Sequence, residues 1–240
     1  MKYLSVFLIA VIALSSCNII DQKRIKGNGH VISKTYDLKD FAQIDIGDNM
    51  DVYIQQGTDY SVKIETDENL FKYLDVNVHD NKSLEVDVTN NTNLDATGEV
   101  KVYITAPWLD KVDISGAAQL QTRGKFTQDR KIKFDLSGAS SGNVSVRAPV
   151  VELEASGAST LTADGESRDV KANASGASTI NAFNLMAEKT DADASGASTV
   201  RVFSSIALKA KANGASTIKY KGNPQVTSEA GGAGSVSKGD

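Results

Sequence analysis

The sequence contains few of the residues on which many catalytic and metal-binding sites depend. Its 240 residues include one cysteine, two histidines, one tryptophan and three prolines. A single cysteine excludes an internal disulfide and any metal site that needs several thiolates. Few prolines and few tyrosines make the chain unlike a disordered or prion-like one. The formal net charge of -4 and the sequence pI of about 5.3 argue against a nucleic-acid partner, which would need a concentrated basic face.

The N-terminal region lacks an apolar run long enough to span a membrane. The run from Leu4 to Leu14 has 11 residues. A helix that rises about 1.5 Å per residue needs roughly 20 residues to cross a hydrocarbon core of about 30 Å. With the basic Lys2 before it, this run is typical of the hydrophobic part of a signal peptide.

Small residues and a cysteine follow the apolar run. The segment Leu14-Ser15-Ser16-Cys17 resembles the bacterial lipobox, in which the cysteine is acylated and becomes the first mature residue. This predicts a lipoprotein signal peptide over residues 1–16, lipidation of Cys17 and a tether over residues 17–26. Acyl chains would anchor the protein to a membrane, so we expect it in the bacterial cell envelope, at the outer membrane, periplasmic or surface-exposed. The alternative is an ordinary secretory signal that leaves one free thiol.

A corner of small residues, written SGA or close to it, is repeated along the second half of the chain. Seven copies occur, with successive offsets of 22, 19, 19, 20, 18 and 18 residues. A repeat of this length is typical of solenoids. A glycine can adopt a positive φ where the chain bends, so we expect the following residues to be structural turn glycines: Gly116, Gly138, Gly157, Gly176, Gly196, Gly214 and Gly232.

The residues around each corner alternate between apolar and polar, as in a strand with one buried face. Before the first corner, for example, Val112 and Ile114 alternate with Lys111 and Asp113. Stacking such units about 4.8 Å apart produces an all-β protein, a parallel β-helix, in which equivalent inward side chains lie on one another. Coils of about 18–22 residues favour the right-handed, pectin-lyase-like form, because a left-handed helix would keep hexapeptide spacing throughout. Serine and threonine hydroxyls at the corners are expected to bond along the stack.

The N-terminal half shows the same alternation at longer intervals. Residues 44–52 match residues 112–120 in pattern, and residues 74–78 and 84–88 form another alternating pair. No linker separates the two halves. We therefore expect a single β-helix domain over residues 27–240, with longer coils at its start.

Several of these segments together are similar to the head GIN domain family of proposed autotransporter adhesins. The resemblance spans nearly the whole chain after the tether. It implies a right-handed parallel β-helix in a lipoprotein or secreted protein of Bacteroidetes-type bacteria, a role in adhesion, and no catalytic residues. The segments are Gly27-Asn28-Gly29, FAQIDIGDNMDVYIQQG at residues 41–57, SVKIETDENL at residues 61–70, the proline at 107 with VDISGA after it, and the SGAS corners.

One outward column, two residues before each corner, is rich in carboxylates. Such a column could bind calcium or supply an acid and base pair for polysaccharide chemistry. Lysines in the neighbouring column would instead neutralise the carboxylates, and we favour this solvated, charge-alternating face over a calcium site near residues 113–154. The column consists of Asp45, Asp113, Asp135, Glu154, Asn173, Asp193, Lys211 and Glu229.

Other candidate sites have less support. His30 and His79 lie in segments that favour solvated loop residues over a catalytic base, and the repeated serines lack the strand-to-helix context of a nucleophile elbow. The threonine column that begins at Thr160 lacks the second column of an ice-binding surface. Phe183 and Phe203 recur at coil spacing, which favours packing over ligand contact. We predict no catalytic, cofactor-binding or metal-ligating residue, and no cofactor.

These observations favour a non-enzymatic protein of the cell surface or envelope that acts in adhesion or binds a ligand through a β-helix face. The ligand would be a glycan or a protein. The alternative is a polysaccharide-binding or polysaccharide-processing β-helix protein, and a third interpretation is an architectural envelope component without a dedicated ligand. Weak self-association through the edge of the last coil, near Val236, is compatible with the fold.

Overall fold

The computed structural model describes residues 23–89 and 91–239 of the chain. The predicted signal peptide and Cys17 lie outside the described residues. Lys23–Lys26, at the end of the predicted tether, forms strand β1. No helix among the described residues is long and apolar enough to cross a membrane.

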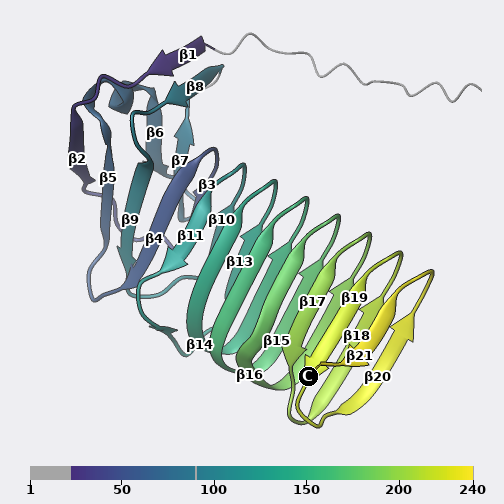
Figure 1. Cartoon of the computed structure of the whole chain (residues 1–240). Helices are drawn as coiled ribbons and strands as arrows, with labels where there is room; N and C mark the ends of the chain where they lie inside the picture. Colours follow the sequence, from purple (N-terminus) through teal and green to yellow (C-terminus); the bar gives the residue numbers. More distant parts are fainter. Residues whose placement is uncertain (1–22, 90, 240) are drawn as a thin grey trace, which may run out of the picture.

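Two sheets run along the molecule and meet at the small-residue corners, which lie in a row (Figure 1). Strands before the corners form the first sheet, together with β7, and strands after the corners form the second sheet, together with β9. Equivalent strands of successive coils pair in parallel. The predicted right-handed parallel β-helix, with coils of about 18–22 residues in the C-terminal half, is confirmed.

The strand bounds follow the predicted alternation. The first sheet contains β3 (Gln43–Ile46), β7 (Ser83–Val88), β10 (Lys111–Ile114), β13 (Ile132–Leu136), β18 (Ala207–Ala212) and β20 (Gln225–Ala230). The second sheet contains β4 (Met50–Gln56), β9 (Val100–Ala106), β11 (Gln119–Thr122), β17 (Thr199–Phe203), β19 (Thr217–Lys221) and β21 (Ser235–Lys238). Three long strands run from one corner to the next and belong to both sheets: β14 (Ser141–Ala155), β15 (Thr160–Ala174) and β16 (Thr179–Ala194). The short strand β12 (Phe126–Thr127) pairs with β14.

The core is a stack of inward side chains that repeat at the same place in each coil. Val112 lies opposite Phe134, Phe134 opposite Leu153, and Leu153 opposite Ala172. All four are buried, and they belong to one continuous cluster that extends from Phe41 to Ile218. Since each coil covers the apolar face of the next, the hydrophobic effect stabilises the coil interfaces as well as the two sheets.

Every corner contains a left-handed glycine, and the five corners between the first and the last also contain a buried serine. The seven turn glycines have φ between 69° and 75°, and the carbonyls of the first six each accept a bond from the next coil, as at Ala177 N–H to Gly157 O (2.8 Å). Ser178 is 1% exposed, and its hydroxyl donates to the carbonyls of Ser175 and Ala155. Ala155 belongs to the preceding coil, so this hydroxyl bonds along the stack. Ser140, Ser159, Ser198 and Ser216 are buried at the same position.

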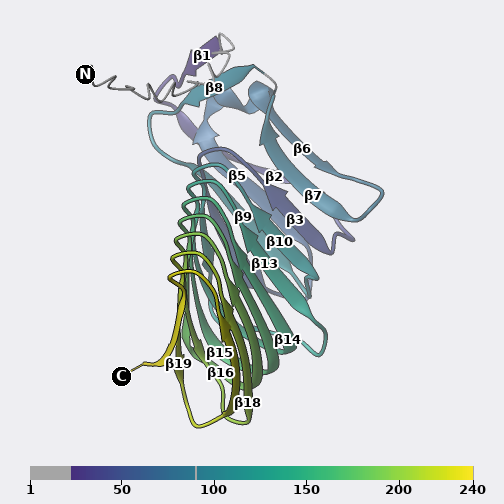
Figure 2. The ribbon, with the colours of Figure 1, turned by 90° about the vertical axis from the view of Figure 1, so that its right-hand side faces the viewer.

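The N-terminal half departs from the predicted simple stack of longer coils. β3 lies between β7 and β10, and β4 lies between β9 and β11. The coil made by β3 and β4 is therefore followed in space by β10 and β11, although residues 57–110 come between them in sequence. β6 (Leu74–Val78) and β7 form an antiparallel hairpin that projects beside the stack (Figure 2). The hairpin turn uses Lys82 with a φ of 62°.

Further antiparallel pairs close the N-terminal end. β5 (Ser61–Asp67) pairs in antiparallel with β2 (Val31–Tyr36) and with β9. A 3-10 helix η1 (Glu68–Tyr73) follows β5 and buries two apolar side chains. β1 pairs in parallel with β8 (Thr92–Asp95) as a separate two-stranded sheet. The alternation of apolar and polar residues predicts where strands lie but not which strands pair. The sequence therefore did not predict this part of the topology.

Asp67 forms hydrogen bonds with two of these N-terminal segments. Its carboxylate is 1% exposed and accepts bonds from Gly29 N–H (2.7 Å), Thr97 N–H (2.8 Å) and the Thr97 hydroxyl (2.9 Å). Burial alone would raise the pKa of Asp67, but these hydrogen bonds outweigh burial and lower it. The carboxylate thus holds the segment after β1 and the segment after β8 against the end of β5.

Candidate functional site

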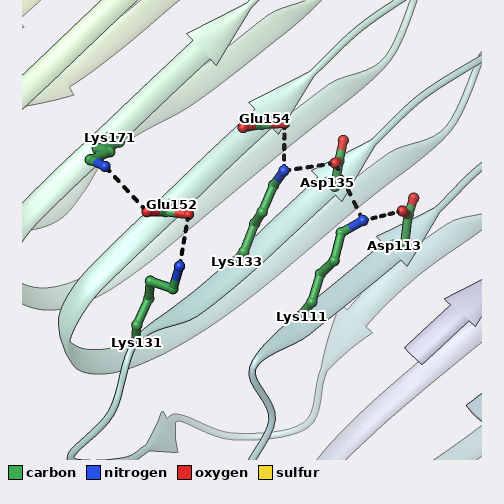
Figure 3. A network of polar contacts seen from close by, with 8 residues as sticks. All are labelled: Lys111, Asp113, Lys131, Lys133, Asp135, Glu152, Glu154 and Lys171. Carbon is green, nitrogen blue, oxygen red and sulfur yellow. Dashed lines mark hydrogen bonds and ion pairs between the residues drawn. The ribbon is translucent and has the colours of Figure 1, made fainter. Parts of the chain in front are cut away.

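The predicted carboxylate column lies on the outward side of the first sheet, here called the charged face, where lysines alternate with it (Figure 3). Lys111 Nζ lies 2.5 Å from Asp113 and 3.8 Å from Asp135. Lys133 Nζ lies 3.1 Å from Asp135 and 2.7 Å from Glu154. Burial disfavours the charge on Lys133, but the bonds with Glu154 and Asp135 outweigh burial and raise its pKa. Each lysine therefore bridges two coils.

This pairing agrees with the charge-alternating face that we favoured over a calcium site. A second row repeats it, because Lys131 and Lys171 both pair with Glu152, at 3.5 Å and 3.4 Å. Among the described residues, no three His, Cys, Asp or Glu side chains are placed so that they could hold a metal ion. The middle of the charged face therefore serves to join coils, with each exposed pair contributing about 0–1 kcal/mol.

Carboxylates outnumber lysines at the N-terminal end of the charged face. Burial and the nearby carboxylates of Asp113 and Glu85 raise the pKa of Asp45. Asp48 occupies the corner position that glycine fills in later coils, with a φ of 62° that aspartate tolerates better than most residues. Burial and then the neighbouring Asp87 raise the pKa of Asp48. The start of the corner row is therefore a negatively charged region.

A cavity of about 570 Å³ lies beside these first corners. On one side are the corner residues 48–51 and 116–119, and on the other are β8 and the segment that leads into β9. We call it the corner pocket. Its apolar lining includes Val88, Leu94, Ala96, Val100 and Ala117, and its polar lining includes Asp48, Asn49, Asp51, Thr92, Asn93, Asp95, Glu99 and Gln119.

The corner pocket combines apolar walls with carboxylates and amides. Burial and the close Glu99 carboxylate raise the pKa of Asp51 at its edge. Asp48 accepts a bond from Val88 N–H at 3.2 Å, which joins the corner to the end of β7. Carboxylate and amide oxygens accept hydrogen bonds, amide nitrogens donate them, and the apolar walls exclude water. This combination suits an uncharged or positively charged ligand that carries hydroxyl groups.

The histidines and aromatic residues singled out in the sequence lie elsewhere. His30 and His79 are exposed, and their rings lie beside Glu68 and Glu85. Phe183 is half-buried, and Lys221 Nζ lies over its ring, 4.8 Å from the centroid. The corner pocket itself was not predicted, because its wall comes from β8, whose return to the first corners depends on the N-terminal topology. The aspartate at position 48, where later coils have glycine, was the only local sign of it in the sequence.

The fold is shared with proteins of known structure. A structure described as a putative adhesin from Bacteroides fragilis is 21% identical, with a TM-score of 0.81, and the match covers 89% of this chain and 98% of that one. One described as a putative lipid binding protein from Parabacteroides distasonis is 20% identical, with a TM-score of 0.73, over 91% and 100% of the two chains. A putative adhesin from Parabacteroides merdae gives 21% identity and a TM-score of 0.70, over 91% and 100%. Identities this low show the fold alone.

Comparison by sequence is more specific. Residues 40–224 match the model of a family described as "Putative auto-transporter adhesin, head GIN domain". No protein with curated annotation matches the sequence.

Proposed function

The chain belongs to the head GIN domain family, and from this we propose that it is a non-enzymatic, adhesin-like protein of the bacterial envelope that binds a saccharide in the corner pocket. The observation that carries the proposal is the size and lining of that cavity. Its volume of about 570 Å³ falls within the usual range for small-ligand sites, about 300–1,000 Å³. Asn93 and Gln119 supply amides, Asp51 and Glu99 supply carboxylates, and Leu94 supplies an apolar wall.

A saccharide fits this lining better than an anion or a purely apolar ligand. Sugar hydroxyls both donate and accept hydrogen bonds, which amides and carboxylates can complement. An anion would face the carboxylates at Asp48, Asp51 and Glu99, and like charges in a partly desolvated site repel strongly. The ligand is therefore a neutral or amino-bearing sugar unit.

The Ala117 position allows the pocket to be closed without altering the coils. Ala117 is exposed and lines the pocket, and Ala177 is exposed at the equivalent corner of a later coil. We expect Ala117→Trp to weaken binding by at least about 10-fold, since the indole would occupy the cavity. Ala177→Trp is the matched control and should bind like the unaltered protein. Binding is measured on a panel of neutral and amino-bearing oligosaccharides immobilised on a surface.

Two outcomes of this experiment would count against the proposal. If the unaltered protein bound no saccharide on the panel, the proposed ligand class would be wrong. If Ala117→Trp bound as well as Ala177→Trp, the ligand would lie elsewhere on the molecule.

The alternative function, polysaccharide processing, also rests on the corner pocket. Burial and the close Glu99 carboxylate raise the pKa of Asp51, and a carboxyl group with a raised pKa beside a second carboxyl group can act as the general acid on a glycosidic bond. Release of shorter oligosaccharides by the unaltered protein, and loss of that release in Asp51→Asn, would establish this alternative. Binding without any release supports the non-enzymatic role.

Attachment to the membrane through Cys17 is a further part of the proposed function, supported by the lipobox-like sequence before it. In the native bacterium, we expect a labelled fatty acid to be incorporated into the full-length protein and the protein to fractionate with the outer membrane. Cys17→Ala should abolish both, because no other cysteine is present to accept an acyl chain. Label that persisted in Cys17→Ala, or an unaltered protein without label, would contradict this assignment.

A further inference from the structure

Two tyrosines stack on the outward side of the second sheet, next to the corner pocket. Tyr53 on β4 lies directly opposite Tyr103 on β9. Their ring centroids are 5.2 Å apart and their planes differ by 16°. Figure 1 shows β4 and β9 side by side, with β5 and β11 flanking them. Both rings are partly exposed, and because they stack on each other they form one aromatic ridge on this face, here called the platform.

Two cations lie over the platform. The guanidinium carbon of Arg123 is 4.5 Å from the centroid of Tyr53 and 4.8 Å from that of Tyr103. Lys63 Nζ, from β5, is 4.6 Å from the centroid of Tyr103. Arg123 and Lys63 have no carboxylate partner within ion-pair distance among the described ion pairs. The lysines in the middle of the charged face behave differently, since each pairs with carboxylates.

The platform continues toward the C-terminal coils as a row of amides. Gln121 lies opposite Tyr53, and Asn143 lies opposite Gln121 in the next coil. Both amides are exposed. Together with Tyr53 they line a shallow depression of about 70 Å³. Aromatic rings and amides therefore follow one another along the stack, with Arg123 and Lys63 over the rings and Asp51, shared with the corner pocket, at the edge of the depression.

We infer that the Tyr53–Tyr103 platform is a second binding site, specific for a saccharide that carries a carboxylate or sulfate group. The parts of the tyrosine rings that Arg123 and Lys63 leave uncovered offer apolar contacts to a sugar ring, and Gln121 and Asn143 offer bonds to its hydroxyls. Arg123 and Lys63 provide the positive charge that the acidic group needs. This site differs in charge from the corner pocket, so it extends the proposed function to a second sugar class.

The number of cations separates this ligand from a nucleic acid. Of the cations in the described part of the chain, only Arg123 and Lys63 lie over the rings, and Lys101 beside them pairs with Glu99 at 3.3 Å. Nucleic acids are bound through about 6–10 phosphate contacts in salt-dependent complexes. Two available cations match one or two negative charges, as on a single acidic sugar unit.

The test uses the full-length protein and oligosaccharides that end in a uronic acid, a sialic acid or a sulfated sugar, with neutral analogues of equal length. We expect the unaltered protein to bind at least one acidic oligosaccharide more tightly than its neutral analogue, and more weakly as salt is raised. The double variant Lys63→Gln/Arg123→Gln should reduce that affinity by about 10-fold or more. Calorimetry measures both.

Matched controls are present in the same chain. Arg130 lies over the ring of Trp108 at 4.0 Å, and Lys221 lies over the ring of Phe183. The double variant Arg130→Gln/Lys221→Gln changes the net charge equally and should bind like the unaltered protein. If it lost affinity as much as the platform variant did, general charge attraction would explain the binding and the inference would be wrong.

Ala117→Trp separates this inference from the proposed function. Binding of acidic oligosaccharides should survive that substitution, whereas binding of neutral ones should not. Failure of every acidic oligosaccharide to bind would overturn the inference and leave the corner pocket unaffected. Equal affinity for single-stranded DNA or for an acidic peptide would overturn the assignment to saccharides.

Discussion

Asp67→Asn is expected to lower the free energy of unfolding by about 2–3 kcal/mol, because the amide cannot accept all three bonds that the carboxylate accepts. Gly29 N–H, Thr97 N–H and the Thr97 hydroxyl all donate to the buried carboxylate. The amide nitrogen would have to face at least one of these donors. Denaturant unfolding at neutral pH measures the change, with Asp169→Asn as the control. Asp169 pairs with Arg168 at the surface, so its loss should cost less than about 1 kcal/mol.

The cost of Asp67→Asn should depend on pH in a defined direction. The folded-state pKa of Asp67 is lowered, so the folded chain binds fewer protons here than the unfolded chain. The stabilisation is therefore complete above the unfolded pKa, about 3.9, and is lost as pH falls through the folded value. The difference between unaltered protein and variant should be constant above about pH 5 and shrink below about pH 4. A difference in the free energy of unfolding that grew as the pH was lowered would show that the charge of Asp67 is not the source of the stabilisation.

The same substitution should also impair the corner pocket. Thr97 follows β8 and precedes Gly98 and Glu99, which line the cavity. Releasing Thr97 from Asp67 frees one wall of the pocket, and a less ordered wall must be ordered again when a ligand binds. Saccharide binding in the pocket should therefore weaken in Asp67→Asn at temperatures where the variant is still folded. Binding of acidic sugars to the tyrosine platform should change less, because Tyr53 and Tyr103 lie on paired strands of the stack.

The repeating part of this molecule could be predicted from sequence because its signals are local and repeated. Alternation around each corner determines which side chains face inward, and the spacing of Gly138, Gly157 and Gly176 determines which residues lie opposite one another. Even the pairing of Lys133 with Asp135 and Glu154 follows from two neighbouring outward columns. Once the coils are in register, residues at equivalent positions of successive repeats lie next to one another in the structure.

The N-terminal end could not be predicted in the same way. The position of β3 between β7 and β10 depends on which strand edges are still unpaired when later segments of the chain join the sheet. The alternation of apolar and polar residues carries no information about that order. Both proposed binding sites lie in this region. The pairing of Tyr53 with Tyr103 joins residues separated by β5, β6, β7 and β8 in sequence. Function is therefore proposed where the repeat is interrupted and residues distant in sequence are brought together.

Gly157→Ala should strongly destabilise the middle of the stack although it adds only one methyl group. Gly157 has a φ of 70°, and a Cβ there would lie 2.6 Å from the carbonyl oxygen of Gly138 in the preceding coil. That carbonyl already accepts a bond from Ala158 N–H at 2.7 Å, so it cannot move without breaking the contact between coils. Left-handed strain of about 1–2 kcal/mol adds to an overpacking cost of about 1–3 kcal/mol. We expect a loss of about 2–5 kcal/mol in the free energy of unfolding.

Gly124→Ala separates the backbone strain from the contact between coils. Gly124 has a φ of 84°, but a Cβ there would meet no atom within 4 Å. Its substitution should therefore cost only the strain, about 1–2 kcal/mol. In a solenoid each coil contacts only its neighbours, so Gly157→Ala should also speed hydrogen exchange in residues 138–176 before it does so near Asp67. Equal costs for the two alanines, or uniform loss of protection along the chain, would mean that close stacking of the corner glycines does not hold the coils together.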